Sequence, residues 1–504
     1  MEQVIPAFFG CAPCSSLSLF HRLSRLSLSA MASPVDFPYD VWHLIVCALI
    51  WDSTLSPVQS YANRAAVAAV DKEWKDRLYG TSIFWSRLNI FHALPVSRIG
   101  FFLSKCVVGP IDVTLFLRDV WWIAGDPAPA TPRRLRDYVD SVFDALGDTS
   151  PRWRSFTIET EHPVIFDQVA KRCCTLSARS MESMELSYVA MRGYINPDAI
   201  SHDGPAERFP WFNNQFPALR RVVSFCVPVV LSVFSGVRSV EITAYDNATP
   251  LPPGFLSALF DIASNLESVR LGAILPFEVN HSFALRSPTL RSLDLEFHRG
   301  DFAGVLFAAL EVPSLVDLTV RSVHVFLDRL LIRPDVLSKI SRFRVYSHIG
   351  DRTSIPLLFA ALTDLTCLDL VHARPLAFEG YRRWALERDR LGLSCIAGRL
   401  RELRLPRCDL RSVVDVVDLL ADNAPSADTE VGLRVLRVER PLNLRASDPR
   451  LAWLRNMVSN FALTSTYSVP ILPFTAPTGT TSTLLTGTTA HVALAQVTLS
   501  SLYS

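Results

Sequence analysis

The chain has 504 residues, of which 49% are hydrophobic and 20% are charged, so it exceeds one compact core and most of it should fold. Fifty Lys and Arg against forty-nine Asp and Glu give a net charge of +1, which excludes a global field that would gather nucleic acid or an anionic membrane surface. Ten cysteines, mostly single in apolar stretches, exclude a disulfide scaffold and indicate an intracellular compartment, cytoplasmic or nuclear.

The segment 1–33 is predicted to be a leader without ordered structure. Its Ser/Leu-rich composition weakly resembles an organellar transit peptide, and Glu2 is its only acidic residue before Met31. The alternative is that translation begins at Met31, because Met-Ala-Ser-Pro leads directly into the first patterned segment. We favour the second alternative, in which the leader is not translated.

Residues 34–92 carry the pattern of a small helical module. Pro38 can occupy the first turn of a helix, and apolar residues then recur at the spacing of one buried helical stripe, namely Val41, Leu44, Ile45, Ala48 and Leu49. A second helix is predicted from about Ser60 to Leu78, with Trp74 on its apolar face. A bundle of about sixty residues lies near the lower limit for independent stability, so it should benefit from a partner.

These residues resemble the F-box. Phe37-Pro38-Tyr39-Asp40-Val41 is similar to its opening Leu-Pro-x-Glu, the segment from Val67 to Trp74 to its middle Val-Cys-x-x-Trp, and the segment from Phe84 to Leu88 to its closing Leu-Trp. Phe37, Asp40 and Asp71 depart from the usual Leu, Glu and Cys or Ser.

In that family the motif docks the Skp-type adaptor of a Skp, cullin and F-box ubiquitin ligase. The resemblance implies adaptor contacts at Pro38, Val41, Leu44 and Ile45, and an F-box core of Trp74, Trp85 and Leu88. The alternative is that the same side chains only fill the interior of the module. We favour docking, because a bundle this small has more apolar side chains than its interior can hold.

After a connecting or N-terminal capping segment, 93–150, a repeat is predicted over residues 151–455. The pattern apolar-x-x-apolar-x-apolar begins at Trp153, Met181, Val237, Leu266, Leu290, Leu315, Ile340, Leu365, Leu400 and Leu433. From Leu266 to Leu365 the start of the pattern advances at a nearly constant step of about 25 residues. This period is typical of leucine-rich repeats, in which short parallel strands line a curved solenoid and helices lie on the convex side.

The predicted fold is therefore α/β: a small helical F-box module followed by an irregular leucine-rich-repeat-like solenoid. Only the stretch from Leu400 to Leu410 has the fuller repeat form, with Cys408 at the Asn/Cys position. A two-layer doubly wound sheet is the alternative, but it would not require constant spacing. The whole resembles F-box proteins with degenerate leucine-rich repeats, of the fungal type.

The residues between the apolar positions of each strand should point to the concave surface. They are Arg270, Asp294, Glu296, Asp317, Arg321, Arg342, Arg344, Tyr346, Asp369, Glu402, Arg404, Arg437 and Glu439. Mixed signs favour a protein partner that is discriminated by charge placement. The alternative is a solvated face with no partner.

No catalytic motif is found. The chain has no Gly-rich phosphate loop, nucleophile elbow or metal-ligand cluster, and the lone Cys11-x-x-Cys14 lacks a second pair at zinc spacing. His162 and His202 stand beside acidic residues in what read as surface loops. We expect no enzyme activity, no cofactor and no metal, although an unrecognised hydrolase or transferase site remains a third hypothesis.

The segment 456–504 is uncharged and rich in Ser and Thr, so a disordered tail is expected, apart from a stray strand over residues 492–499. The predicted function is the substrate-recognition subunit of a Skp, cullin and F-box ligase, with an unknown protein substrate and with no nucleic-acid or membrane partner. The alternative is a repeat scaffold or ligand-binding protein without a ligase, whose helices only cap the solenoid.

Overall fold

The computed structural model describes most of the chain between residues 38 and 464. The described residues are 38–51, 57–91, 94–117, 132–188, 216–227, 231–243, 255–274, 284–297, 301–322, 327–346, 354–371, 400–405, 433–439 and 448–464. They fall into two compact units, the first drawn from residues 1–129 and the second from residues 130–480. The predicted leader and the predicted strand at 492–499 lie outside the described residues. Within the described ranges, no helix combines the length and apolar character that a membrane span requires.

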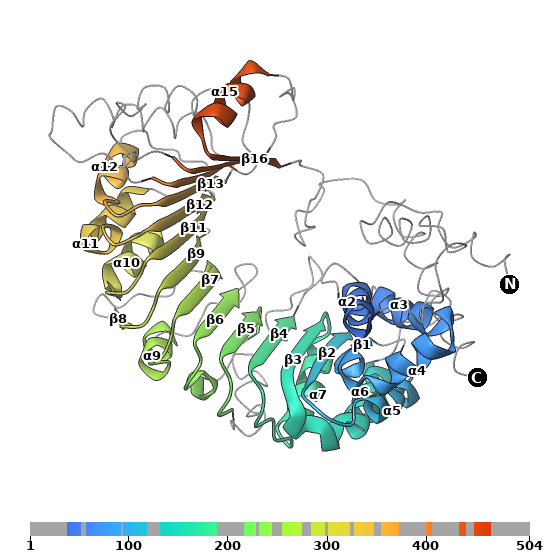
Figure 1. The fold of residues 1–504 in the computed structure, drawn as a ribbon. Coiled ribbons are helices and arrows are strands. Elements are labelled where there is room, and N and C mark those ends of the chain that lie inside the picture. Colours follow the sequence, from blue (N-terminus) through green and yellow to red (C-terminus); the bar gives the residue numbers. More distant parts are fainter. Residues whose placement is uncertain are drawn as a thin grey trace, which may run out of the picture. The chain divides into compact units, whose positions relative to one another are not determined.

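The described part of the first unit begins with three helices and a short 3-10 turn: α2 (Tyr39–Ile50), α3 (Pro57–Val70), α4 (Lys72–Gly80) and η3 (Ser82–Trp85) (Figure 1). The prediction of one helix from Ser60 to Leu78 is wrong, because the first helix ends at Val70 and Asp71 separates it from the next one. This residue has an extended backbone, and its carboxylate accepts a hydrogen bond from the Trp74 backbone N–H at 2.8 Å. Aspartate is a favoured N-cap residue, so Asp71 starts a new helix.

A strand, helix and strand follow in the same unit: β1 (Arg87–Phe91), α5 (Val96–Lys105) and β2 (Ile111–Leu117). The two strands are parallel, and Leu88 lies opposite Val113, one repeat length further along the chain. The expectation of an all-helical module ending at residue 92 is therefore wrong. From Arg87 to Ile90, exposed or half-buried residues alternate with buried ones, which is the pattern of a strand, and β2 supplies the hydrogen-bonding partner for β1.

In the part of the chain that the structure describes, the second unit contains twelve strands in one parallel sheet. They are β3 (Trp153–Thr160), β4 (Ser183–Tyr188), β5 (Arg221–Phe225), β6 (Ser239–Thr243), β7 (Ser268–Ile274), β9 (Ser292–Phe297), β11 (Asp317–Ser322), β12 (Arg342–Tyr346), β13 (Cys367–Val371), β14 (Glu402–Leu405), β15 (Val435–Glu439) and β16 (Asn460–Thr464), which lie in this order. A separate pair, β8 (Leu285–Arg286) and β10 (Leu310–Glu311), is also parallel.

The described helices of this unit are α6 (Pro132–Leu146), α7 (Pro163–Cys173), α9 (Phe255–Ile262), α10 (Asp301–Ala309), α11 (Pro334–Leu337), α12 (Ser354–Ala361) and α15 (Pro449–Met457), with 3-10 turns η5 (Gly147–Arg152), η7 (Leu231–Phe234) and η8 (Leu327–Ile332). The sheet curves, and α9 to α12 lie along its outer side (Figure 1). The segment 93–150 was predicted to connect the domains. Its helix α6 and the start of η5 belong to the second unit.

The strand register confirms the predicted repeat spacing. Leu293 pairs with Leu318, Leu318 with Phe343, and Phe343 with Leu368, so that each partner lies one repeat length further along the chain. Side chains at these positions are buried, because every second residue of a strand points to the same face. One apolar row therefore runs under the whole series of strands and forms the core of this unit.

Hydroxyl groups link successive repeats where an asparagine ladder is missing from the sequence. Thr289 Oγ1 donates to the Leu266 carbonyl at 2.8 Å, Thr366 Oγ1 to the Ser341 carbonyl at 3.0 Å, and Ser459 Oγ to the Arg434 carbonyl at 3.0 Å. Each bond joins the turn before one strand to the corresponding turn of an earlier repeat. Serine and threonine hydroxyls thus add side-chain hydrogen bonds between repeats, and at the Ser341 and Arg434 carbonyls they supplement backbone N–H donors.

The predicted end of the solenoid at residue 455 is wrong, because β16 continues the sheet. Phe461 pairs with Leu436 in a parallel register, and Val458-x-x-Phe461-x-Leu463 is one more copy of the repeat pattern. The strand β5 was likewise missing from the predicted series. Its third core position is Ser224, a buried polar residue whose hydroxyl donates to the Val227 carbonyl, so the apolar pattern is interrupted there.

Candidate interaction surfaces

The helix α2 has two apolar faces. Trp42, Val46 and Leu49 are buried, and the Trp42 ring meets the rings of Trp74 and Phe84 edge-on at centroid distances of 6.1 and 5.4 Å. The prediction of one buried stripe through Val41 and Leu44 is wrong, because the large Trp42 occupies the interior instead. A tryptophan buries more area than a valine or leucine does, so it determines which face of the helix turns inward.

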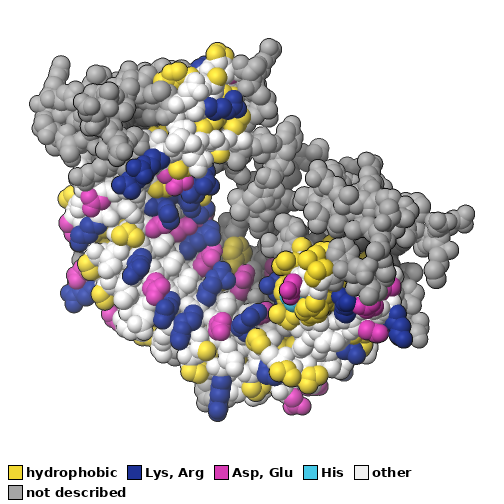
Figure 2. Space-filling view, in the orientation of Figure 1, with side chains coloured by type: hydrophobic (Ala, Val, Ile, Leu, Met, Phe, Trp, Pro, Cys, Tyr) yellow, Lys and Arg dark blue, Asp and Glu magenta, His cyan; other side chains and the backbone are white. Residues whose placement is uncertain are grey.

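The opposite side of α2, here called the outer face, carries the predicted adaptor contacts. Leu44 is 68% exposed and Val41 is 41% exposed, while Pro38 is also exposed and Ile45 is half-buried. Tyr39 adds a further exposed ring. Figure 2 shows apolar side chains gathered over this helix. Such a contiguous apolar surface is typical of an interaction site.

The three residues predicted as F-box core lie in different environments. Trp85 and Leu88 are buried, and Trp74 is half-buried beside Trp42. The Trp85 ring packs on Phe101 and Phe102 of α5 at centroid distances of 5.7 and 5.5 Å. Trp85 and Leu88 therefore join the helices to the strand, helix and strand that follow.

A buried arginine, not anticipated from the sequence, joins three elements of this unit. Arg64 on α3 donates from Nε to the Phe84 carbonyl at 3.1 Å, from Nη1 to Ser60 Oγ at 3.1 Å and from Nη2 to the Arg87 carbonyl at 3.3 Å. Its position in the Ala/Val-rich run of α3 was the available signal, because a charge on an apolar helix face needs internal partners.

In the second unit, the residues between the buried positions form what we call the ladder face, the side of β4 to β15 opposite the apolar row. In register along its middle row lie Glu185, Val223, Glu241, Arg270, Asp294, Thr319, Arg344, Asp369, Arg404 and Arg437. All the predicted concave-face residues from Arg270 to Arg437 lie on this face, and the side chain of Glu439 lies outside the described residues. Figure 2 shows basic and acidic side chains alternating over it.

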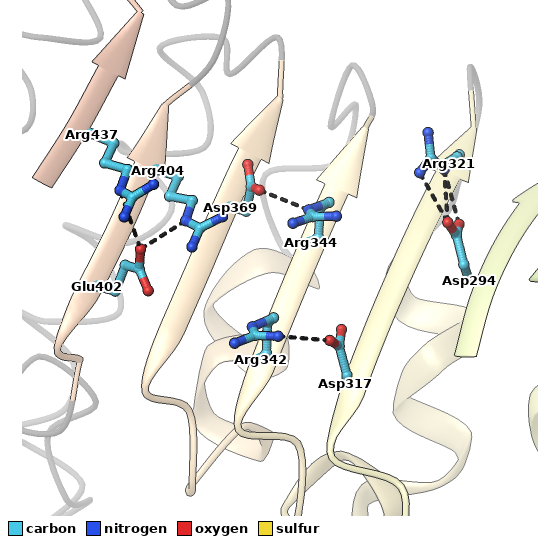
Figure 3. Close-up of polar contacts among 9 residues, drawn as sticks. All are labelled: Asp294, Asp317, Arg321, Arg342, Arg344, Asp369, Glu402, Arg404 and Arg437. Carbon is cyan, nitrogen blue, oxygen red and sulfur yellow. Dashed lines mark hydrogen bonds and ion pairs between the residues drawn. The ribbon is translucent and has the colours of Figure 1, made fainter. Parts of the chain in front are cut away.

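The charges of the ladder face pair with one another, most of them across neighbouring strands and Arg404 with Glu402 within β14 (Figure 3). The shortest contacts of these pairs are Arg270 to Glu241 at 2.7 Å, Arg321 to Asp294 at 2.9 Å, Arg342 to Asp317 at 3.2 Å, Arg344 to Asp369 at 2.7 Å and Arg404 to Glu402 at 2.8 Å. The sequence contained a signal for this, because Arg342 and Asp369 follow Asp317 and Arg344 by one repeat length. Glu241, the partner of Arg270, was not anticipated.

Two features distinguish the Arg321 pair from the others. Both Nε and Nη2 of Arg321 donate to the Asp294 carboxylate, and the guanidinium carbon lies 4.1 Å from the centroid of the Tyr346 ring. Two-pronged hydrogen bonding and stacking on a ring both suit the planar guanidinium group. Asp294, Arg321 and Tyr346, each predicted for the concave surface, thus form a polar cluster across β9, β11 and β12.

Burial and hydrogen bonds shift the pKa of several groups on this face. Burial raises the pKa of Glu185, and the positive charge of Arg221 opposes this shift. A hydrogen bond from Arg404 lowers the pKa of Glu402. Burial raises the pKa of the Cys367 thiol. Glu185 is thus held in an environment that disfavours its charged form, whereas Glu402 is held in one that favours it.

The histidine and cysteine groupings considered for catalysis are only partly described. His162 precedes the first turn of α7 and is half-buried, while His202, Cys11 and Cys14 lie outside the described residues. Among the residues that the structure describes, no group of three or more His, Cys, Asp or Glu is arranged to hold a metal ion.

Comparison with protein-family models finds no match, and comparison with curated protein sequences finds none either. Among solved structures, the chain is similar to one described as the crystal structure of a TLR13–ssRNA13 complex, at 13% identity and a TM-score of 0.31. The similarity covers 76% of this chain and 52% of that one, so this chain matches about half the length of its neighbour. A likeness at this TM-score carries no argument.

The class of the second unit rests on its own geometry. Parallel strands in one sheet, which pair at a constant repeat length from β9 to β13, a continuous apolar row beneath them and helices on the outer side together define a leucine-rich-repeat-like solenoid.

Proposed function

We propose that the chain is a substrate receptor that carries a protein target on its ladder face and a Skp-type adaptor on the outer face of α2. The adaptor would connect it to a cullin within a ubiquitin ligase. The observation that carries this proposal is the exposure of Leu44 and Val41 on a helix whose other face is filled by Trp42. Binding of a partner that removes such a surface from water is favourable, because burial of apolar area lowers the free energy.

The receptor would act by proximity. The ladder face presents side chains from many parallel strands, so an extended target can contact several repeats at once. Holding the target near a conjugating enzyme on another subunit raises the effective concentration of its lysines. No catalytic group on this chain is needed for that role.

A second candidate is a repeat protein that does not join a ligase, and in it α2 to α4 serve only as an end cap of the solenoid. The position of Trp85 and Leu88 favours it. Both resemble the closing residues of an F-box, yet Leu88 belongs to β1 and pairs with β2 at the same repeat length that relates strands β9 to β13 of the second unit.

Capture of the adaptor by the full chain separates these candidates. We expect the wild-type protein to co-purify with a Skp-type adaptor and Leu44→Asp to lose at least about tenfold of it, since a buried carboxylate in the interface is costly. Leu357→Asp is the matched control, because Leu357 is a 60% exposed leucine on α12 of the other unit. Circular dichroism should show that both variants melt like the wild type. Failure of the wild-type chain to capture the adaptor, or capture that survives Leu44→Asp, would favour the second candidate.

A further inference from the structure

Among the side chains that the structure describes, which do not include that of Glu439 on β15, the charges of the ladder face do not balance at its β12 to β15 end. Arg321 pairs with Asp294, which Arg270 also approaches at 3.7 Å, and Arg342 pairs with Asp317. Beyond them, three guanidinium groups, those of Arg344, Arg404 and Arg437, share the carboxylates of Asp369 and Glu402 (Figure 3). This group of five residues, here called the arginine cluster, therefore carries one positive charge in excess.

The arginines of this cluster have donors to spare. Arg404 contacts Glu402 Oε1 through Nε at 2.8 Å, and Arg437 approaches the same oxygen through Nε at 3.7 Å. The terminal amino groups of both side chains have no acceptor among the described residues. An arginine carries five N–H donors, and the Arg437 side chain is 54% exposed. Two neighbouring strands thus offer unused donors to solvent at the same level of the sheet.

A buried acceptor with no partner lies in the same cluster. Asp369 is only 5% exposed, and its Oδ2 accepts a hydrogen bond from Arg344 Nε at 2.7 Å. Its Oδ1 is buried and has no hydrogen-bond partner among the described residues. Buried polar atoms are nearly always satisfied, so this oxygen indicates that a donor is missing. Asp369 lies between Arg344 and Arg404 in the strand register, at the centre of the cluster.

We propose that the arginine cluster binds an acidic segment of the target protein. A carboxylate side chain of that segment bridges the free amino groups of Arg404 and Arg437. The backbones of the two adjacent strands that carry these arginines lie about 5 Å apart. Because Asp369 Oδ1 is buried, its donor comes from within the cluster, from Arg404 on the adjacent strand once the ligand has repositioned that side chain.

The charge count favours a carboxylate over a phosphate. The cluster has one excess positive charge, which one carboxylate neutralises, whereas a phosphoryl group carries about −1.5 to −2 at neutral pH. Paired guanidinium groups also match the two oxygens of a carboxylate. This inference rests on the proposed function, because it names the chemistry of the target that the ladder face would hold, but it does not involve the outer face of α2.

Binding of fluorescein-labelled octaglutamate to the full chain, followed by fluorescence anisotropy, tests the proposal. We expect binding that weakens as salt is added. The double variant Arg404→Gln and Arg437→Gln should lose about tenfold in affinity, since it removes the charge-assisted hydrogen bonds. Arg286→Gln is the control, because Arg286 is an exposed arginine on β8, away from the ladder face, and is paired with Glu311.

Three results would overturn the proposal: no binding by the wild-type chain, an equal loss with Arg286→Gln, or tighter binding of a phosphoserine octapeptide that depends on the same two arginines. The single variant Arg437→Gln, at an exposed position, keeps the test valid if the double variant melts early. Adaptor capture by the same variants separates the two proposals, because loss of peptide binding with capture intact rejects the acidic target alone. Loss of capture in Leu44→Asp with peptide binding intact leaves the acidic target standing.

Discussion

The two units expose opposite kinds of surface. The outer face of α2 presents Val41 and Leu44, which are apolar, whereas the ladder face presents arginines and carboxylates that already bind one another. Covering an apolar surface lowers the free energy with almost any partner. A surface whose charges are already paired must exchange existing contacts for new ones, so only a partner with complementary charges binds it favourably. The first kind of surface suits a constant partner, and the second suits selection among targets.

The largest change in the free energy of unfolding should come from the buried row of the second unit, and almost none should come from the outer face of α2. Phe343→Ala removes a fully buried ring from the centre of the sheet, so the free energy of unfolding should fall by about 3–5 kcal/mol. Leu44→Ala should change it by less than about 0.5 kcal/mol, because the side chain is exposed. Urea denaturation measures both. A comparable loss at Leu44 would mean that something already covers the outer face.

A smaller effect should distinguish the ladder face from ordinary surface charge. Arg321→Met removes two-pronged hydrogen bonding to Asp294 and stacking on Tyr346 at a site where both charged partners are less than one-third exposed. We expect a loss of about 1 kcal/mol. Arg286→Met breaks a solvent-exposed pair with Glu311 and should cost close to nothing. If thermal melts show equal losses, the ladder pairs contribute no more than surface pairs do.

The smallest effect should appear in the pH dependence of two glutamates on the same face. Burial raises the pKa of Glu185 above its ordinary value of 4.5, so the charged form destabilises the fold above that raised pKa. Glu185→Gln should therefore melt slightly higher than the wild type at pH 7, and the difference should vanish as the pH falls below about 4.5.

Glu402→Gln is the matched comparison with the opposite sign. A hydrogen bond from Arg404 lowers the pKa of Glu402, so its charged form stabilises the fold above the ordinary value. That stability is lost as the pH falls through the lowered pKa. The variant should melt lower than the wild type at pH 7 and approach it in acid. A shift of the same sign for both variants would contradict the difference in environment.

Much of the solenoid could be predicted because its repeat is periodic. The constant repeat length placed Leu293, Leu318, Phe343 and Leu368 in one row from the sequence alone, and the strand register confirms that row. The two missing strands had specific reasons. Ser224 interrupts the apolar pattern of β5, and the uncharged composition after Arg455 drew attention away from Phe461 and Leu463.

The helical unit was harder to predict, because its patterns are short and allow more than one arrangement. Val41 and Leu44 fit a helical stripe as well as Trp42, Val46 and Leu49 do, and periodicity alone does not say which stripe turns inward. Asp71 could have been recognised as an N-cap, since aspartate favours that position. Arg64 could not have been assigned its partners, because the Phe84 and Arg87 carbonyls come from later elements.

By itself, the order of residues determined where most strands of the repeat lie, though not β5 and β16, and which of their side chains point inward, because alternation along a strand is a local property of the backbone. Only the tertiary structure decided which face of α2 is covered and which ladder charges bind each other where the repeat length gave no signal, as for Arg270 and Glu241. It alone left the Arg404 and Arg437 amino groups and one oxygen of Asp369 without partners among the described residues. These outcomes depend on groups brought together from distant parts of the chain, whose distances no local pattern contains.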